Sequence, residues 1–173
     1  IMPIPYLWIM VHYGSYDPRL ILMAVLVTIW GFRLSFNFAR RGGYSLKFWT
    51  GEEDYRWSIL QAKPEFAQNW KWVLFNFLFI SFYQMGLVLL TTLPAIRVLG
   101  IHTPIGLFDI VLAIVILLLI FVEFLSDQQQ YNYQTEKYRQ IESGNVEPYY
   151  RIGFVHTGLW AWMRHPNYMA EQA

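Results

Sequence analysis

The 173-residue sequence contains no cysteine and few charged residues. Without cysteine the chain cannot form disulfides, thiolate zinc sites or a cysteine nucleophile. Charged residues make up 14%, whereas about 25% is usual for a soluble domain, so a free-standing soluble globule does not fit this composition. The formal net charge of +1 lacks the basic excess that nucleic-acid binding requires, and we expect no nucleic-acid partner.

Several catalytic sequence patterns are also missing. The histidines form no HxxxH or HxxH pair, which disfavours the membrane di-iron oxygenases and desaturases, and we expect no metal site. No GxGxxG pattern follows an expected strand, no GxxxxGK[ST] phosphate loop occurs, and no GxSxG elbow is present. The histidines are His12, His102, His156 and His165.

Long apolar runs dominate what is present. Apolar residues make up 55% and aromatic residues 19% of the chain. Residues 20–38, 72–92 and 105–125 form three runs of about the 20 apolar residues that a helix needs to cross a bilayer. We therefore expect an all-α, polytopic transmembrane helical bundle with at least three spans, forming a single membrane domain over residues 1–173.

A further helix is expected from Pro166, because proline favours the first position of a helix. The sequence opens at Ile1 without a methionine and ends at Ala173 inside this helix. We expect the chain to be part of a longer one with additional spans.

The distribution of basic residues predicts the orientation in the membrane. The segment between the first two runs and the segment after the third carry ten lysines and arginines, and the opposite side carries two. The positive-inside rule then places the first two segments on the cytoplasmic or matrix side. The ten are Arg40, Arg41, Lys47, Arg56, Lys63, Lys71, Lys137, Arg139, Arg151 and Arg164, and the two are Arg19 and Arg97.

Polar residues interrupt each apolar run. Arg33 and Asn37 lie four apart on one helix face, and Glu123 precedes Asp127 by four residues. Charges at bilayer depth usually face a bundle interior or a wet cavity, although Arg33 and Glu123 are equally compatible with snorkelling or pairing between helices. In the second run, α-helical spacing predicts one shared face for Asn76, Tyr83 and Gln84.

Two polar segments allow both a functional and a purely solvated interpretation. GEEDYRW, residues 51–57, is an acidic cluster that suits acid–base chemistry or a solvated loop. DQQQYNYQTEKYRQ, residues 127–140, is expected to continue the third helix into water. Its amides and aromatics suit either an interfacial helix or a polar wall for a nucleotide.

The most informative segment is TGLWAWMRHPNYMAEQA, residues 157–173. Asn167 and Glu171 fall four apart on the helix expected from Pro166, with Tyr168 beside them. An arginine, a histidine and free backbone N–H groups at a helix start favour anions such as a pyrophosphate. A loop-to-helix junction with an interfacial arginine is the alternative. The residues at this start are Arg164 and His165.

RHPNY followed by Glu171 resembles the C-terminal signature of the membrane sterol and steroid reductases. The preceding TGLWAWM is similar to the lead-in of the sterol C14-reductase branch. FARRGGYSLKFWTGEEDYRW, residues 38–57, resembles a branch of the steroid 5-alpha-reductase-like family, and Ser126-Asp127-Gln128 after the third apolar run fits the same pattern. The resemblance covers most of residues 18–173.

This resemblance implies a multi-helix membrane fold with NADPH in a polar cavity open to the cytoplasmic side. It implies hydride transfer to a carbon–carbon double bond of a steroid, sterol or other lipid, with Tyr168 as the candidate for polarising a carbonyl or donating the proton. The residues implied to contact the cofactor are Arg40, Arg41, Asp127, Arg164, His165, Asn167, Tyr168 and Glu171.

The sequence departs from that family at two places. Ala170 stands where a glycine is common, and Tyr133, Gln134 and Thr135 stand where a basic residue is usual. Fewer cations would hold the phosphates of NADPH less firmly.

Two other functions are also compatible with the sequence. An S-adenosylmethionine-dependent membrane methyltransferase would share an RHPxY-type motif. A retired reductase could instead serve as a structural or accessory subunit of a larger membrane complex, including a respiratory one, alongside other membrane subunits. The bacterial inner membrane, the endoplasmic reticulum and the mitochondrial inner membrane are all compatible with the sequence.

Overall fold

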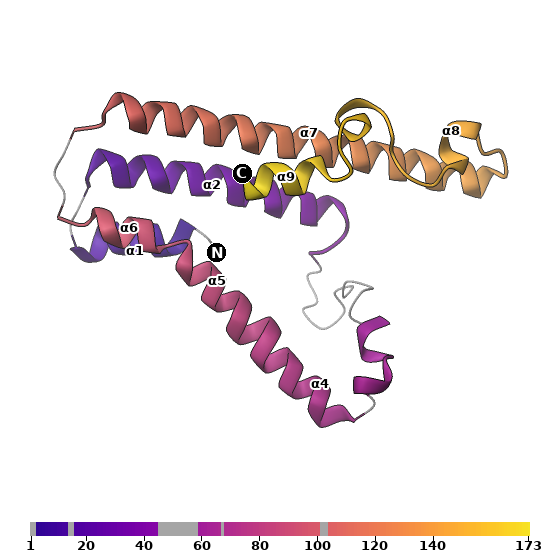
Figure 1. Cartoon of the computed structure of the whole chain (residues 1–173), viewed down its shortest axis with the longest axis horizontal. Coiled ribbons are helices and arrows are strands. Elements are labelled where there is room, and N and C mark those ends of the chain that lie inside the picture. The colour runs from indigo at the N-terminus through magenta and orange to yellow at the C-terminus, as the bar shows by residue number, and fades with distance from the viewer. Residues whose placement is uncertain (1–2, 14–15, 45–58, 67, 101–103) are drawn as a thin grey trace. The chain divides into compact units, whose positions relative to one another are not determined.

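The computed structural model describes residues 3–13, 16–44, 59–66, 68–100 and 104–173, which form helices and their connections (Figure 1). No β-strand occurs among these residues, so the expectation of an all-α fold is confirmed. The elements are α1 (Pro3–Tyr13), α2 (Pro18–Arg40), η1 (Pro64–Phe66), α4 (Asn69–Phe75), η2 (Asn76–Tyr83), α5 (Gln84–Leu90), α6 (Leu93–Val98), α7 (Leu107–Ser143), α8 (Pro148–Arg151), η3 (Gly158–Ala161) and α9 (Pro166–Gln172).

The chain divides into two compact units, Ile1–Ile105 and Gly106–Ala173. The expectation that residues 1–173 form a single membrane domain stays a prediction. The acidic cluster at residues 51–57 lies outside the described residues.

The first unit is built where α1, α2 and α6 pack together. The Asp17 side chain accepts a hydrogen bond from the Arg19 N–H at 2.9 Å, which begins α2 with Pro18 in its first turn. The Tyr6 hydroxyl donates to the Thr91 carbonyl at 2.7 Å and joins α1 to the end of α5. Helix α1 was not among the helices predicted from the sequence. The buried residues of this core are Tyr6, Ile9, Leu20, Ala24 and Ala95.

Residues 69–98 form the second apolar segment, in which α4, η2, α5 and α6 follow one another. The middle part, η2, is a π-helix. The α-helical spacing that grouped Asn76, Tyr83 and Gln84 on one face does not hold in a π-helix, whose hydrogen bonds run from i to i+5. The prediction of a single polar face was therefore wrong: Asn76 is half-buried, while Tyr83 and Gln84 are exposed.

The second unit is built on α7, a 37-residue helix with two different halves. Residues 107–125 are almost entirely apolar, and residues 126–143 are polar. The Asp109 carboxylate accepts from the Gly106 N–H at 2.9 Å at the start of α7. Gly144, with φ 74°, ends it in the left-handed conformation that glycine adopts most easily. The third apolar run thus continues into a polar helix, as expected.

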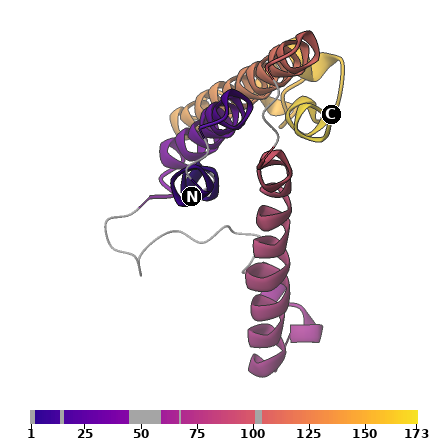
Figure 2. The same cartoon turned by 90° about the vertical axis from the view of Figure 1, so that its left-hand side faces the viewer.

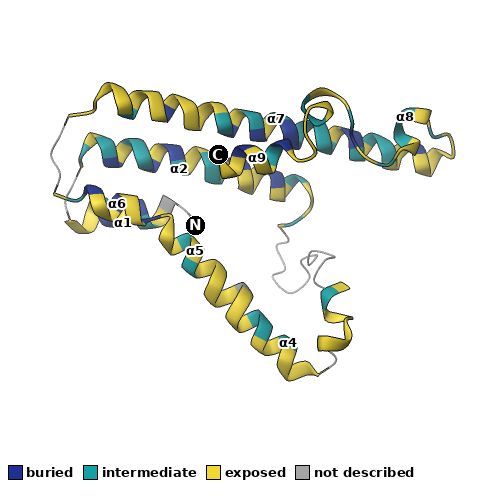
Figure 3. Cartoon of the chain, viewed as in Figure 1, coloured by how far each residue is buried: buried dark blue, intermediate teal, exposed yellow. Residues whose placement is uncertain are grey.

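Within the part of the chain that the structure describes, three helical segments are long and apolar enough to cross a membrane: Pro18–Arg40, Asn69–Val98 and Leu107–Ser143. At most 28% of the most apolar window in any of them is buried inside the protein. Exposed residues accordingly cover α4, α5 and much of the apolar half of α7 (Figure 3). Apolar helices that protein does not cover need a lipid environment, which makes this an integral membrane protein.

Candidate functional site

Residues 144–173 leave the end of α7 and fold back along it, and we call them the C-terminal hook (Figures 1 and 2). The hook contains α8, η3 and α9, and α9 packs against α7. The expected helix from Pro166 is confirmed as α9. This fold-back brings the two halves of the predicted motif together, since Asp127 lies on α7 and Asn167 on α9.

Three hydrogen bonds join the hook to one stretch of α7. The Trp160 indole Nε1–H donates to the Ser126 carbonyl at 3.1 Å. The Leu159 backbone N–H donates to the Gln129 Oε1 at 3.1 Å. The Asn167 Nδ2 donates to the Asp127 Oδ1 at 3.3 Å. Ser126 and Asp127 are buried, so these bonds are shielded from water and position the hook on the helix.

The backbone turn at Gly158 permits this approach. Its φ of +63° lies in the left-handed region, and a Cβ at this position would come within 2.7 Å of the Gln129 amide. Any other residue would displace the side chain that accepts the Leu159 N–H. Ser126, Gln129, Gly158 and Trp160 were not among the predicted site residues, although the Gly-Trp-rich TGLWAWM segment was the signal that could have identified the last two.

The predicted motif residues divide into a buried and an exposed set. Pro166 and Ala170 form the face of α9 that is buried, while Asn167 is half-buried. The ring of His165 lies beside two aromatic rings, with centroids 6.2 Å from Trp160 and 5.5 Å from Tyr168. The predicted residues whose side chains are exposed are Arg164, His165, Tyr168 and Glu171.

Two buried amide oxygens, one on α9 and one on α7, have no hydrogen-bond donor within the described part of the chain. They are the Oδ1 of Asn167 and the Oε1 of Gln130, and neither has a partner among the residues that the structure describes. Gln130 follows Asp127 by three residues and so lies on the same side of α7. A buried acceptor without a donor is costly. These two oxygens can therefore accept hydrogen bonds from a ligand that carries N–H or O–H groups, such as a carboxamide or a ribose.

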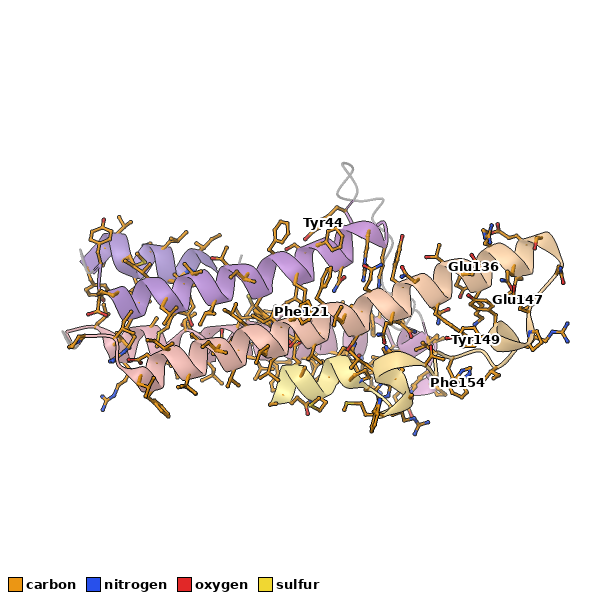
Figure 4. All side chains as sticks on the ribbon, turned by 90° about the horizontal axis from the view of Figure 1, so that it is seen from above. Tyr44, Phe121, Glu136, Glu147, Tyr149 and Phe154 are labelled. Carbon is orange, nitrogen blue, oxygen red and sulfur yellow. The ribbon has the colours of Figure 1, made fainter. Side chains whose placement is uncertain are left out.

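A cavity of about 500 Å³ lies between the polar half of α7 and the first part of the hook (Figure 4). The Tyr149 hydroxyl and the Thr157 hydroxyl, which both line it, are hydrogen-bonded to each other at 2.8 Å. Amides, hydroxyls and tyrosine rings form most of its wall, and Glu136 is the one charged residue of that wall. The lining residues are Gln129, Tyr131, Asn132, Tyr133, Thr135, Glu136, Tyr149, Tyr150, Val155 and Thr157.

Three tyrosines of this wall pack against one another. The ring centroids of Tyr133 and Tyr149 are 5.3 Å apart at an interplanar angle of 77°, and those of Tyr149 and Tyr150 are 4.9 Å apart at 84°. Partial burial raises the pKa of Tyr150, and the nearby carboxylates of Glu136 and Glu147 raise it further. A tyrosine phenol is protonated at neutral pH even without this shift, so Tyr150 can donate a hydrogen bond.

Polar contacts hold the first part of the hook in place around the cavity. Gln140 accepts from the Glu147 N–H at 2.9 Å and donates to Glu136 at 2.9 Å. The Lys137 ammonium donates to the Gly153 carbonyl at 3.3 Å. Arg139 pairs with Glu136 at 2.7 Å on the exposed side, so the carboxylate at the cavity wall has a cation beside it.

The remaining predicted residues lie elsewhere. Arg33 and Asn37 are buried on α2, the Arg40 guanidinium lies 5.5 Å from the centre of the Phe36 ring, and Arg41 is exposed after α2. All belong to the first unit, so the grouping of Arg40 and Arg41 with the motif of the second unit stays a prediction. Among the described residues there is no cluster of three or more metal-binding side chains.

Comparison with known proteins identifies a family to which this chain is similar and a relative from yeast. The family model described as a protein of unknown function, DUF1295, matches residues 2–173. An uncharacterized protein of Schizosaccharomyces pombe is 34% identical over 170 residues, which cover 92% of this chain and 47% of the yeast protein. The chain thus spans about half the length of that relative. No solved structure matches.

Proposed function

The chain belongs to the DUF1295 family, and from that premise we propose that it is a membrane-embedded reductase acting on lipids. It transfers a hydride from a reduced nicotinamide dinucleotide, NADPH by resemblance, to a carbon–carbon double bond of a steroid, sterol or related lipid. The observation that carries this proposal is the 3.3 Å hydrogen bond between Asn167 and Asp127, which joins two motif residues 40 positions apart.

The residues around that contact suit the neutral parts of a dinucleotide. Asn167 and Gln130 each offer a buried acceptor oxygen, which a nicotinamide carboxamide or a ribose hydroxyl can satisfy. Asp127 holds the Asn167 amide so that its nitrogen faces the carboxylate and its oxygen remains for the ligand. The tyrosine- and amide-lined cavity further along α7 offers ring faces and hydrogen-bonding groups for the remainder of the nucleotide.

The charged residues of the motif have a separate role. Arg164 and His165 precede α9 with exposed side chains, where they can reach phosphate groups from the aqueous side. The ion pair with Arg139 offsets part of the repulsion that Glu136 would exert on an anion.

The chemistry requires one hydride and one proton. The reduced nicotinamide, when bound, supplies the hydride to one carbon of the double bond. Tyr168 is the candidate for donating a proton to the other carbon, or to a conjugated carbonyl oxygen, and water restores that proton. Its half-exposed ring lies on α9 one residue after Asn167. The position of Asp127, where the apolar half of α7 ends, supports a lipid as the acceptor.

A binding experiment with Asn167→Ala tests the proposal. We expect the wild-type protein in lipid nanodiscs to bind NADPH or NADH, and the variant to bind about tenfold more weakly, since one lost hydrogen bond in a shielded site is worth about 1.4 kcal/mol. Titration of the reduced nicotinamide fluorescence measures both affinities. Asn145→Ala, at an exposed position after α7, is the control and should bind normally.

Three results would contradict the proposal. Wild-type protein that binds S-adenosylmethionine and neither dinucleotide would indicate a methyltransferase. Binding of no nucleotide at all, with the chain purifying in fixed ratio with other membrane subunits, would indicate an accessory protein. Equal affinity in Asn167→Ala and Asn145→Ala would remove Asn167 from the binding site.

A further inference from the structure

The corner between η3 and α9 carries apolar side chains that the protein does not cover. The Trp162 side chain is 86% exposed, the highest value among the large hydrophobic residues described. Met163 follows at 37%, and Met169 on the outer face of α9 is 44% exposed. A tryptophan with this exposure next to further apolar residues indicates a surface that meets something other than water.

Two hydrogen bonds determine which part of α7 lies beside this corner. Two residues before Trp162, the Trp160 indole donates to the Ser126 carbonyl, and five residues after it Asn167 donates to Asp127. Ser126 is the first residue of the polar half of α7. The corner therefore lies level with the point where the apolar half of α7 ends, which is where a bilayer surface would cross the helix.

The direction of α9 is consistent with a bilayer surface at this point of α7. From Pro166 the helix runs back along α7 toward the apolar half, past the part of α7 that holds Phe121 (Figures 1 and 4). Seven residues of α-helix extend about 10 Å. The outer face of α9, with Met169, is then on the lipid side of the boundary.

The residues nearest the corner fit a phospholipid surface. Arg164 follows Met163 directly, and the two acidic residues of the hook, Glu147 and Glu171, lie nearer its two ends. Tryptophan and basic residues together are typical of the membrane–water interface, where the indole sits at headgroup level and the cations meet anionic lipids.

We propose that Trp162 and Met163 lie in the headgroup region of the same bilayer that α7 crosses, so that η3 and α9 form a re-entrant element. The occupant of this surface is phospholipid, which meets the Met169 side of α9, while Pro166 and Ala170 are buried. The inference concerns placement in the membrane and does not depend on the reductase proposal.

The absence of cysteine from the 173 residues allows a clean test by site-directed spin labelling. Trp162→Cys is labelled with a nitroxide in the full chain, in nanodiscs of phosphatidylcholine and phosphatidylglycerol. Collision rates with oxygen, which concentrates in lipid, and with a water-soluble nickel chelate report the depth of the label.

Two positions on the same unit calibrate the measurement (Figure 4). Phe121→Cys reports the apolar half of α7, where Phe121 is 56% exposed. Phe154→Cys reports water, because Phe154 follows Gly153, whose carbonyl accepts from Lys137, and Lys137 lies about 16 Å beyond Ser126 along the helix axis. Its exposure of 61% makes it a matched aromatic control.

We expect the nickel collision rate at Trp162→Cys to be several-fold lower than at Phe154→Cys and higher than at Phe121→Cys. Met163→Cys should give the same intermediate value, which keeps the test valid if the tryptophan substitution disturbs folding. A nickel rate equal to that at Phe154→Cys at both positions would place the corner in water and overturn the proposal. Exclusion of both oxygen and nickel would indicate a protein partner there and overturn it equally.

Discussion

Two glycines show how much a single position contributes to the candidate site. Gly144 and Gly158 both adopt positive φ, at 74° and 63°, where an L-residue costs roughly 1–2 kcal/mol. Their surroundings differ, because a Cβ at Gly144 would meet nothing within 4 Å and one at Gly158 would meet the Gln129 amide. The first glycine ends a helix, and the second also permits the hook to reach α7.

Gly158→Ala is therefore expected to destabilise the protein more than Gly144→Ala. Both substitutions strain the backbone, but only Gly158→Ala moves Gln129 away from the Leu159 N–H, which adds about 1 kcal/mol. Heat-induced unfolding followed by tryptophan fluorescence in nanodiscs compares them. Equal losses of stability would show that the Gln129 contact contributes nothing.

At the scale of an element, the second apolar segment is stabilised by rings along its own length. Trp72, Phe75, Phe79 and Tyr83 stack in sequence, with centroids 5.7, 5.1 and 5.3 Å apart and interplanar angles of 24°, 16° and 13°. None of the described residues in α4, η2 or α5 is buried. We therefore expect the stacked rings to support the π-helix η2 from within.

Phe79→Ala is expected to loosen η2, since it removes two stacked pairs worth about 0.5–1.5 kcal/mol each. Phe77→Ala is the control, because Phe77 is 61% exposed and has no ring contact among the described residues. Hydrogen–deuterium exchange in detergent micelles should show faster exchange of residues 76–83 in Phe79→Ala alone. If both variants exchange at the same rate, the stacked rings do not support the π-helix.

At the scale of the whole molecule, the charge bias and the three apolar segments together predict a topology. The segment after α2 and the hook are expected on one side of the membrane, and the connection between α6 and α7 on the other. Three crossings between the start of α2 and the hook are consistent with this assignment.

Single cysteines labelled from one side test the topology. We expect a membrane-impermeant maleimide added from the cytoplasmic or matrix side to label Tyr44→Cys and Phe154→Cys and to leave Pro104→Cys unmodified. All three positions are exposed in the structure. Labelling of Pro104→Cys together with Tyr44→Cys from the same side would show that residues 69–98 do not cross the membrane.

Composition and periodicity were sufficient to predict the helical fold. Apolar runs of about 20 residues require helices in a membrane, because every backbone polar group must be satisfied within its own segment. The runs at 20–38, 72–92 and 105–125 accordingly lie almost entirely within α2, residues 69–98 and α7. Local chemistry also predicted the start of α9 at Pro166. The α1 helix and the π-helix η2 were missed, because a short apolar stretch and a wider helical turn leave no distinct periodic signal.

The candidate site depended on tertiary structure. The sequence indicated which residues carry the chemistry, since Asp127 and Asn167 were both named from their motifs. Only the fold-back of the hook brings them to 3.3 Å and adds Ser126, Gln129 and Gly158. The physical reason is that helices and spans follow from interactions within a few residues and with lipid, whereas contacts between residues 30 to 40 positions apart depend on how the chain turns between them.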